Sequence, residues 1–111
     1  MNKYHNKKCI YKDMTFDSKK ERDYYVILEM MLKNGQITDL KTQVKFELQP
    51  SFKFNGKTIR SINYIADFTY IKDGKLTIVD TKGYRTEVYK LKKKMMQYNG
   101  YDIEEIWWEI S

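Results

Sequence analysis

The sequence predicts an α/β fold in which a central mixed β-sheet is flanked by two helices. Three observations support this prediction: two helical apolar stripes bounded by capping residues, alternating runs joined by an Asp-Gly turn between them, and a closing apolar run. Helices placed before and after such strands bury their stripes against a sheet. A chain of 111 residues is long enough for one domain with its own core, so we expect a single domain over residues 1–111.

The first helix is predicted to have Asp17 or Ser18 as its N-cap and to end at Asn34-Gly35. Its apolar stripe consists of Tyr24, Tyr25, Leu28, Met31 and Leu32. Residues 1–13 precede this helix as a basic arm, with no helical stripe and with room for a short strand at its end.

Alternating apolar residues predict strand structure from Ile37 to Phe54, interrupted at the only proline, Pro50. After a loop at Asn55-Gly56, two further alternating runs flank Asp73-Gly74. Asp-Gly in this setting is the strongest short-range signal of a hairpin with a two-residue turn.

Two acidic residues are expected to face each other across this hairpin. Counting outward from a two-residue turn sets Asp67 opposite Asp80, with Cβ atoms about 4.5–5.5 Å apart. Like charges this close destabilise a sheet unless a divalent cation bridges them. Lys82 projects from the same face as Asp80, because strand side chains alternate. A three-residue loop with a bulge would instead shift the register and set Asp67 opposite Val79.

Thr86 is the expected N-cap of the second helix, which ends at Asn99-Gly100. The apolar face predicted for this helix consists of Val88, Leu91, Met95 and Tyr98. A last strand is expected from Ile103 to Ile110, with Trp107 on the face opposite that of Ile106, Trp108 and Ile110.

Glu21 has two explanations. In a capping box with Ser18, its carboxylate binds the N-cap amide. Alternatively, Glu21 is a metal ligand, because it lies within the helical stripe and faces the sheet, where a carboxylate needs a partner. The local pattern leaves both open. A metal held by Asp67 and Asp80 would favour the second, with Glu21 as an outer ligand through water.

The composition favours a polyanionic partner, although many basic domains bind no nucleic acid. The formal net charge is +6 and aromatic residues make up 15% of the chain, which suits a groove that attracts phosphate and packs against bases. On the second helix the lysines form either a solvated face or a row of phosphate contacts. The candidate nucleic-acid contacts are Lys19, Lys20, Arg22, Lys57, Arg60, Lys90, Lys93 and Lys94.

Several classes of protein are disfavoured. The lone Cys9 cannot form an internal disulfide, and no apolar run approaches the length of a membrane span. One histidine and one cysteine provide neither a zinc site nor the usual nucleophilic dyad. We therefore expect a reducing intracellular compartment, with no membrane and no disulfide-linked partner.

Asp67, Asp80 and Lys82 together fit the hydrolysis of a phosphodiester, although each acid alone could be an ordinary acid near a turn or a sheet edge. Hydrolysis needs a metal to neutralise a nonbridging oxygen and to lower the pKa of an attacking water. It also needs a cation that positions this water or stabilises the phosphorane. The aspartates suit Mg²⁺ or Mn²⁺, and Lys82 suits the second cation.

The spacing of Glu21, Asp67 and Asp80-x-Lys82 resembles the PD-(D/E)xK nuclease superfamily, whose core is a helix, a three-stranded antiparallel unit, a helix and a closing strand. Ala66 stands in place of the superfamily's proline and Asp80 in place of the commoner glutamate, but neither change removes a ligand. Over roughly residues 3 to 99, the chain also resembles a small phage-type family without firm function. The segments that carry this second resemblance are Phe16–Glu21, Gly35–Leu40 with Gln43, Tyr64–Tyr70, and Val79–Gly83 through Thr86, Tyr89 and Lys94.

The resemblance implies a restriction-endonuclease-like core and a Mg²⁺- or Mn²⁺-dependent DNA endonuclease. Glu21, Asp67 and Asp80 would be metal ligands, Lys82 the catalytic cation and Gln43 a polar residue near the site. The implied origin is a phage or prophage, and the implied location is the cytoplasm of a bacterial host. Some relatives are described as resolvase-like, which makes branched or junction DNA one candidate substrate.

Two-fold symmetry is the simplest way to make two cuts in a duplex or a junction, so we expect a homodimer. Two alternatives to a DNA endonuclease are left open. One is a non-catalytic nuclease-fold module that binds DNA or a partner protein. The other is an RNA-directed nuclease, since no feature of the sequence identifies recognition of the 2′-hydroxyl.

Overall fold

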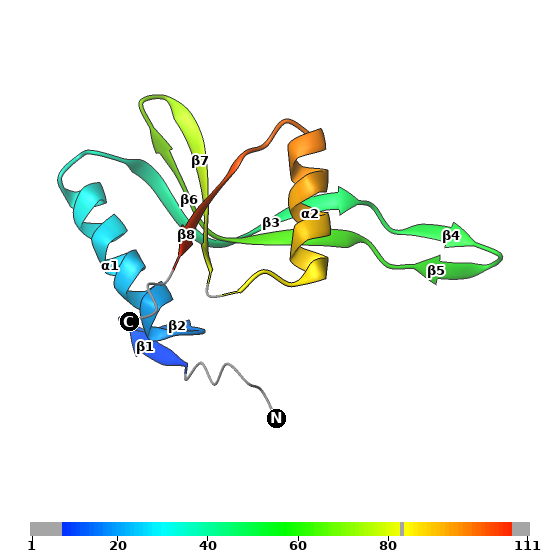
Figure 1. Ribbon diagram of the computed structural model, residues 1–111, viewed down its shortest axis with the longest axis horizontal. Helices are drawn as coiled ribbons and strands as arrows, with labels where there is room; N and C mark the ends of the chain where they lie inside the picture. Colours follow the sequence, from blue (N-terminus) through cyan, green and yellow to red (C-terminus); the bar gives the residue numbers. More distant parts are fainter. Residues whose placement is uncertain (1–7, 83, 108–111) are drawn as a thin grey trace.

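The computed structural model describes residues 8–82 and 84–107, which form an α/β fold with a mixed central sheet and two helices (Figure 1). Within these residues the central sheet has the strand order β3-β6-β7-β8, in which β3, β6 and β7 are antiparallel neighbours and β8 runs parallel to β7. The strands of this sheet are β3 (Thr38–Gln49), β6 (Ile62–Lys72), β7 (Lys75–Lys82) and β8 (Ile103–Trp107). The helices are α1 (Lys19–Lys33) and α2 (Glu87–Tyr98). The coarse prediction of an α/β class is therefore confirmed.

Two short hairpins lie outside the central sheet. The first pairs β1 (Cys9–Tyr11) with β2 (Met14–Phe16), and the second pairs β4 (Phe52–Phe54) with β5 (Lys57–Ile59). The strand at the end of the predicted basic arm is thus present, while residues 1–7 of that arm lie outside the described residues. The predicted end of the closing strand, residues 108–110, lies outside them as well.

Both helices begin at side chains that the sequence predicted as caps. The hydroxyl of Ser18, rather than the carboxylate of Asp17, accepts a hydrogen bond from the amide of Glu21 at 3.1 Å. The hydroxyl of Thr86 accepts one from the amide of Tyr89 at 3.0 Å. Each cap satisfies one of the amides that a helix leaves unpaired in its first turn.

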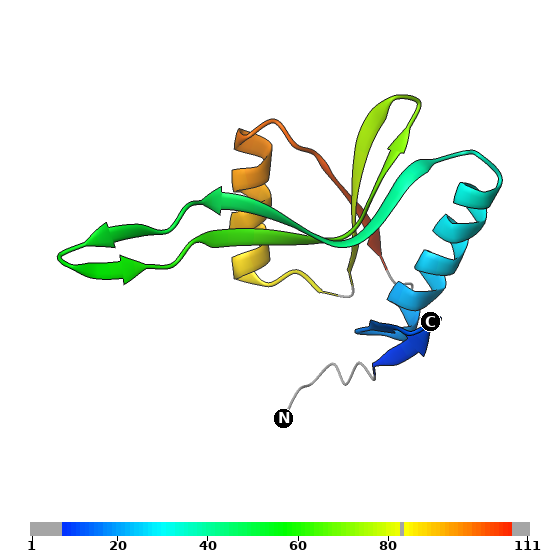
Figure 2. The same cartoon turned by 180° about the vertical axis from the view of Figure 1, so that it is seen from behind.

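The core consists of two clusters, one beneath each helix. Leu28 of α1 packs with Phe68 and Val79, whereas Met96 of α2 packs in the second cluster with Ala66. In Figures 1 and 2 the helices accordingly lie on either side of the β6–β7 hairpin. Asp67 and Asp80 of the β6–β7 hairpin therefore lie between the two core clusters.

The apolar face predicted for α2 is wrong. Val88, Leu91 and Tyr98 are 61%, 58% and 90% exposed, and the buried residues of the helix are Tyr89 and Met96. The true buried stripe is rotated by one residue, about 100°. The prediction placed Lys90, Lys93 and Lys94 opposite the apolar face, but lysine stems can lie along apolar surface while their ammonium groups reach an acid. Leu32, placed in the buried stripe of α1, is likewise exposed at the end of that helix.

The β6–β7 hairpin has the predicted two-residue turn. Asp73 and Gly74 have left-handed backbone conformations, with φ of 52° and 75°, as a type I′ turn requires. The paired residues run from Lys72 with Lys75 to Phe68 with Val79, which rules out the slipped register. The described pairing ends there, one step before Asp67 and Asp80.

The β4–β5 ribbon projects from the sheet as a long arm (Figures 1 and 2). The radius of gyration is 16.0 Å, compared with about 13 Å for a compact domain of this length.

Neither described helix has the length and apolar character that crossing a membrane would require. The single cysteine, Cys9 in β1, makes no disulfide.

Candidate active site

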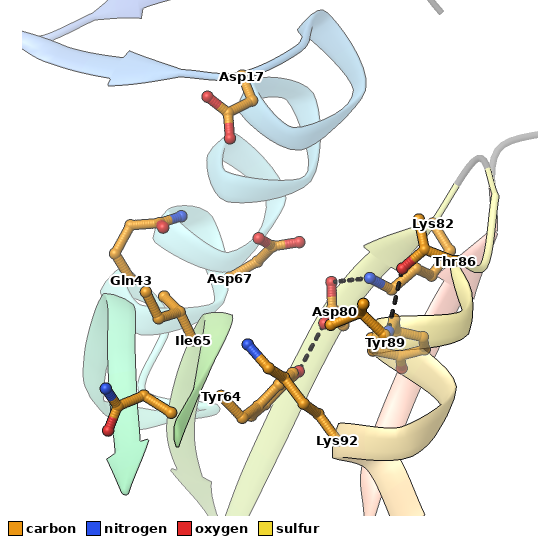
Figure 3. A pocket seen from close by; sticks show the side chains of 12 residues that line it. Asp17, Gln43, Tyr64, Ile65, Asp67, Asp80, Lys82, Thr86, Tyr89 and Lys92 are labelled. Carbon is orange, nitrogen blue, oxygen red and sulfur yellow. Dashed lines mark hydrogen bonds and ion pairs between the residues drawn. The ribbon is translucent and has the colours of Figure 1, made fainter. Parts of the chain in front are cut away.

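A cavity of about 350 Å³ lies beside the point where β6 and β7 separate, next to the first turns of α2 (Figure 3). Asp67 and Asp80 both line it, together with Lys82, Lys92 and Tyr64. The two aspartates thus face one space, as the hairpin register predicted.

Asp80 is held by two neighbouring side chains. The hydroxyl of Tyr64 donates a hydrogen bond to Oδ2 at 2.6 Å, and Nζ of Lys82 forms an ion pair with Oδ1 at 3.0 Å. Lys82 also lies over the ring of Tyr89, with Nζ 3.6 Å from the ring centroid, where the face of the ring attracts a cation. Asp80 and Lys82 therefore share a face, as predicted, and the ammonium group is fixed from two sides.

The carboxylate of Asp67 binds the backbone of β7 just beyond the last described pair of the β6–β7 hairpin. Its Oδ2 accepts hydrogen bonds from the amide of Thr81 at 2.8 Å and from the hydroxyl of Thr81 at 2.9 Å. Burial, repulsion from Asp80 and repulsion from Glu21 raise the pKa of Asp67 to about 8. A proton or a metal ion would relieve this repulsion.

Glu21 is only 4% exposed and faces the sheet. Nε2 of Gln43 donates a hydrogen bond to its Oε1 at 3.2 Å. Burial first, then repulsion from Asp17 and Asp80, raises the pKa of Glu21 to about 7, against a backbone hydrogen bond from Asp17 that lowers it. The amide of Glu21 therefore completes the cap of α1. Its carboxylate, which a capping box would direct at the N-cap amide, is instead bound by Gln43 and lies close enough to the aspartates to be repelled by Asp80.

Gln43 has a strained backbone at the site. Its φ is 52°, a left-handed conformation that is uncommon for a residue with a long side chain. It lies in β3 between the pairs Thr42–Phe68 and Val44–Ala66, and is therefore opposite Asp67. Such strain persists where surrounding structure enforces it, often at functional sites. In this protein the strained residue, Gln43, is also the one whose side-chain amide donates a hydrogen bond to Glu21.

The donor set fits a hard divalent cation with two protein ligands. Mg²⁺ is commonly bound by one or two carboxylates, with water and substrate phosphate completing the shell. Asp67 and Asp80 provide such a pair on one cavity. Within residues 8–82 and 84–107, no group of three His, Cys, Asp or Glu side chains is arranged to hold one ion.

Acidic neighbours divide the predicted nucleic-acid contacts into two groups. Arg22 pairs with Asp23 at 2.7 Å, and Lys90 with Glu87 at 3.1 Å. Lys93 also pairs, with Glu105, and ion pairs are found for none of the other candidates within the described part of the chain: Lys19, Lys20, Lys57, Arg60 and Lys94.

Lys93 is a correction to the predicted binding face. Its Nζ lies 3.3 Å from Glu105 of β8, because α2 turns this lysine towards the sheet rather than away from it. Arg85 and Tyr89 also bind Glu105. Although burial raises the pKa of Glu105, these three donors together lower it to about 2. Lys93 therefore helps to fix α2 on the sheet.

Comparison with known proteins gives a family but no activity. The family described as Protein of unknown function (DUF1064) matches residues 1–111. The chain belongs to this family. No curated protein and no solved structure matches the sequence. The chemistry of this DUF1064 protein must therefore be inferred from its own side chains.

Among the residues that line the cavity of this DUF1064 protein, Tyr64 and Lys92 carry polar groups that were not predicted as site residues. In Figure 3 the amine of Lys92 is directed into the cavity from α2. A signal for Lys92 was present, because it is three residues after Tyr89 and four before Met96, within the true buried stripe. Tyr64 had no comparable signal, since its hydrogen bond to Asp80 joins two strands and does not follow from the period of either one.

Proposed function

We propose that this protein is a metal-dependent DNA endonuclease that hydrolyses phosphodiester bonds. The observation that carries the proposal is the convergence of Asp67, Asp80, Lys82 and Lys92 on one cavity. The raised pKa of Asp67 adds support, because it reports negative charge concentrated where a cation is useful.

The residues of the cavity have separate roles in this proposal. Tyr64 and Lys82 fix the carboxylate of Asp80, and Thr81 fixes that of Asp67. Lys82 positions the attacking water or stabilises the negative charge of the phosphorane. Lys92 contacts a nonbridging oxygen of the substrate, which holds the phosphate beside the two aspartates.

Asp67 and Asp80 would hold Mg²⁺ or Mn²⁺, with Glu21 as an outer ligand. When bound, the ion would neutralise a nonbridging oxygen and lower the pKa of the attacking water. The cluster of carboxylates and the room beside it are consistent with such an ion.

The topology supports a restriction-endonuclease-like core. A helix, three antiparallel strands, a second helix and a closing parallel strand follow one another as α1, β3–β6–β7, α2 and β8. This is the element order of the superfamily that the sequence resembles. A homodimer, a phage or prophage origin and action in a bacterial cytoplasm belong to the same proposal.

A cleavage panel tests the activity directly. The purified protein is incubated with Mg²⁺ or Mn²⁺ and with linear duplex, four-way junction, flap and single-stranded DNA. We expect Asp80→Asn and Lys82→Ala to reduce cleavage by about 100-fold or more, the effect of removing a group that stabilises the transition state. Asp102→Asn and Lys75→Ala change similar charges at exposed positions and should cleave like the wild type. Wild-type activity in a pure, folded Asp80→Asn protein would refute the proposal.

The second candidate is a module of the same fold that binds DNA, or a partner protein, without cutting. One observation favours it: Tyr64 and Lys82 already occupy both oxygens of Asp80. Lys82 could thus serve as a permanent substitute for a metal. Calorimetry separates the candidates, because a module of this kind should take up no Mn²⁺ while still showing salt-sensitive DNA binding.

A further inference from the structure

The β4–β5 ribbon is a projecting element without a core of its own. Its register pairs Phe52 with Ile59 and Phe54 with Lys57, so these four side chains share one face. Phe52 is 44% exposed and Phe54 is 62% exposed. A two-stranded ribbon is marginally stable alone, and exposed phenylalanines on such a ribbon suggest a contact with another molecule.

The charge of the ribbon favours a polyanion over an ordinary protein surface. No acidic residue occurs between Glu47 and Asp67, whereas Lys53, Lys57 and Arg60 all lie in that interval. None of these three cations forms an ion pair within the part of the chain that the structure describes. A duplex presents closely spaced phosphates, and cations such as these bind them with release of the counterions that surround DNA.

The dimensions of the ribbon match those of duplex DNA. Gly56 at the ribbon tip and Asp67 in the cavity are eleven positions apart in the sequence, a span of at most about 36 Å in extended chain. One helical turn of DNA is about 34–36 Å long, and the major groove accepts a two-stranded ribbon. If a DNA phosphate lies beside Asp67, the tip of the β4–β5 ribbon can therefore reach the major groove up to one helical turn away.

We propose that the β4–β5 ribbon is an arm that enters the major groove of duplex DNA within about one helical turn of the phosphate at Asp67 and Asp80. Lys53, Lys57 and Arg60 bind phosphates at the groove edges, and Phe54 makes apolar contacts inside the groove. This inference rests on the proposed function, and it assigns the substrate class: DNA with a duplex segment that extends about one helical turn from the cleavage site.

Salt-dependent binding tests the arm. The affinity of the full chain for a labelled duplex of about three helical turns is measured by fluorescence anisotropy, without divalent metal to prevent cleavage. Lys57→Ala/Arg60→Ala should lower the magnitude of the slope of log affinity against log salt by about 1.8, because each lost phosphate contact contributes about 0.9. The matched control, Lys72→Ala/Lys75→Ala, removes two exposed cations from the other hairpin turn and should leave the slope unchanged.

A second variant tests the apolar contacts separately from charge. Phe52→Ala/Phe54→Ala should weaken binding to the long duplex and keep the salt slope of the wild type. On a duplex shorter than one turn, all variants should bind alike. Circular dichroism checks that each variant is folded, which we expect because no ribbon residue belongs to either core cluster.

Each of four results would overturn the proposal that the ribbon is a DNA-binding arm. Equal slopes for the two double-lysine/arginine variants would mean that only net charge matters. A dimer that dissociates in Phe52→Ala/Phe54→Ala, with unchanged DNA affinity, would show that a second copy of the chain occupies the ribbon. If the wild type cleaves DNA but ribbon variants bind like it, the arm alone fails. If the wild type neither binds nor cleaves DNA, the proposed function fails with it.

Discussion

Burial of Glu21 and Asp67 near Asp80 makes the stability of this protein depend on pH. Both acids have a higher pKa in the folded protein than their ordinary values of 4.5 and 3.8. Between these values and the raised values, the folded protein binds more protons than the unfolded chain. The free energy of unfolding should therefore be highest near pH 4 to 5 and fall as pH rises through about 7 and 8.

Urea unfolding at several pH values in the presence of a chelator measures this effect. Glu21→Gln should flatten the pH dependence and raise the stability at pH 8, because the neutral amide removes one repelling charge. Glu47→Gln is the matched control, since Glu47 is exposed on β3. A Glu21→Gln protein that keeps the full pH dependence of the wild type would contradict the assignment.

Tyr64 is expected to act on catalysis through Asp80. Its hydroxyl donates the 2.6 Å hydrogen bond to Oδ2, and Tyr64→Phe removes that donor while keeping the packed ring. We expect kcat to fall by about 10-fold or more, with a smaller change in KM, because a misplaced ligand disturbs the reacting geometry more than DNA binding. The affinity for Mn²⁺, measured by calorimetry, should fall as well. Tyr98→Phe on the exposed side of α2 is the control, and equal kinetics in both variants would remove Tyr64 from the site.

The sequence predicted those site residues whose positions follow from the regular period of a strand or a helix. Asp67 and Asp80 follow from the two-residue turn, and Glu21 follows from the helical period. The partners that hold them were not predictable in this way. Thr81 and Tyr64 bind the aspartates between β6 and β7, near the pair Phe68–Val79, and such contacts depend on three-dimensional packing rather than on periodicity.

The second helix shows where element-scale prediction failed. Hydropathy placed Leu91 on the buried face, but the helix packs through Met96. We therefore expect Met96→Ala to lower the free energy of unfolding by about 2–5 kcal/mol, since it leaves a cavity in the core. Leu91→Ala on the same helix should change it by less than about 0.5 kcal/mol, as at other exposed positions. Chemical denaturation measures both, and a larger loss for Leu91→Ala would mean that α2 packs through its other face.

The order of elements was predictable at the scale of the whole molecule because caps, turns and alternation are local signals. Ser18, Thr86 and Asp73-Gly74 each mark a boundary that the structure confirms. The projection of the β4–β5 ribbon was not predictable, because alternating residues describe a strand equally well inside a sheet and beyond its edge. The site depends on both kinds of feature, since local signals set the hairpin and tertiary packing opens the cavity.

Metal binding should appear as a gain in the stability of the whole molecule, independent of any cleavage. A ligand that binds only the folded protein stabilises it by about 2.7 kcal/mol at one hundred times its dissociation constant. For a domain of this size the melting temperature should rise by roughly 10 °C. Calorimetry at about pH 8 gives a clear signal, because Glu21 is then largely ionised and Asp67 about half ionised, and both repel Asp80. Asp80→Asn should lose this gain, whereas Asp23→Asn on the exposed side of α1 should keep it. If Mn²⁺ raises the melting temperature equally in all three proteins, it binds elsewhere, and the aspartates of the hairpin are not its ligands.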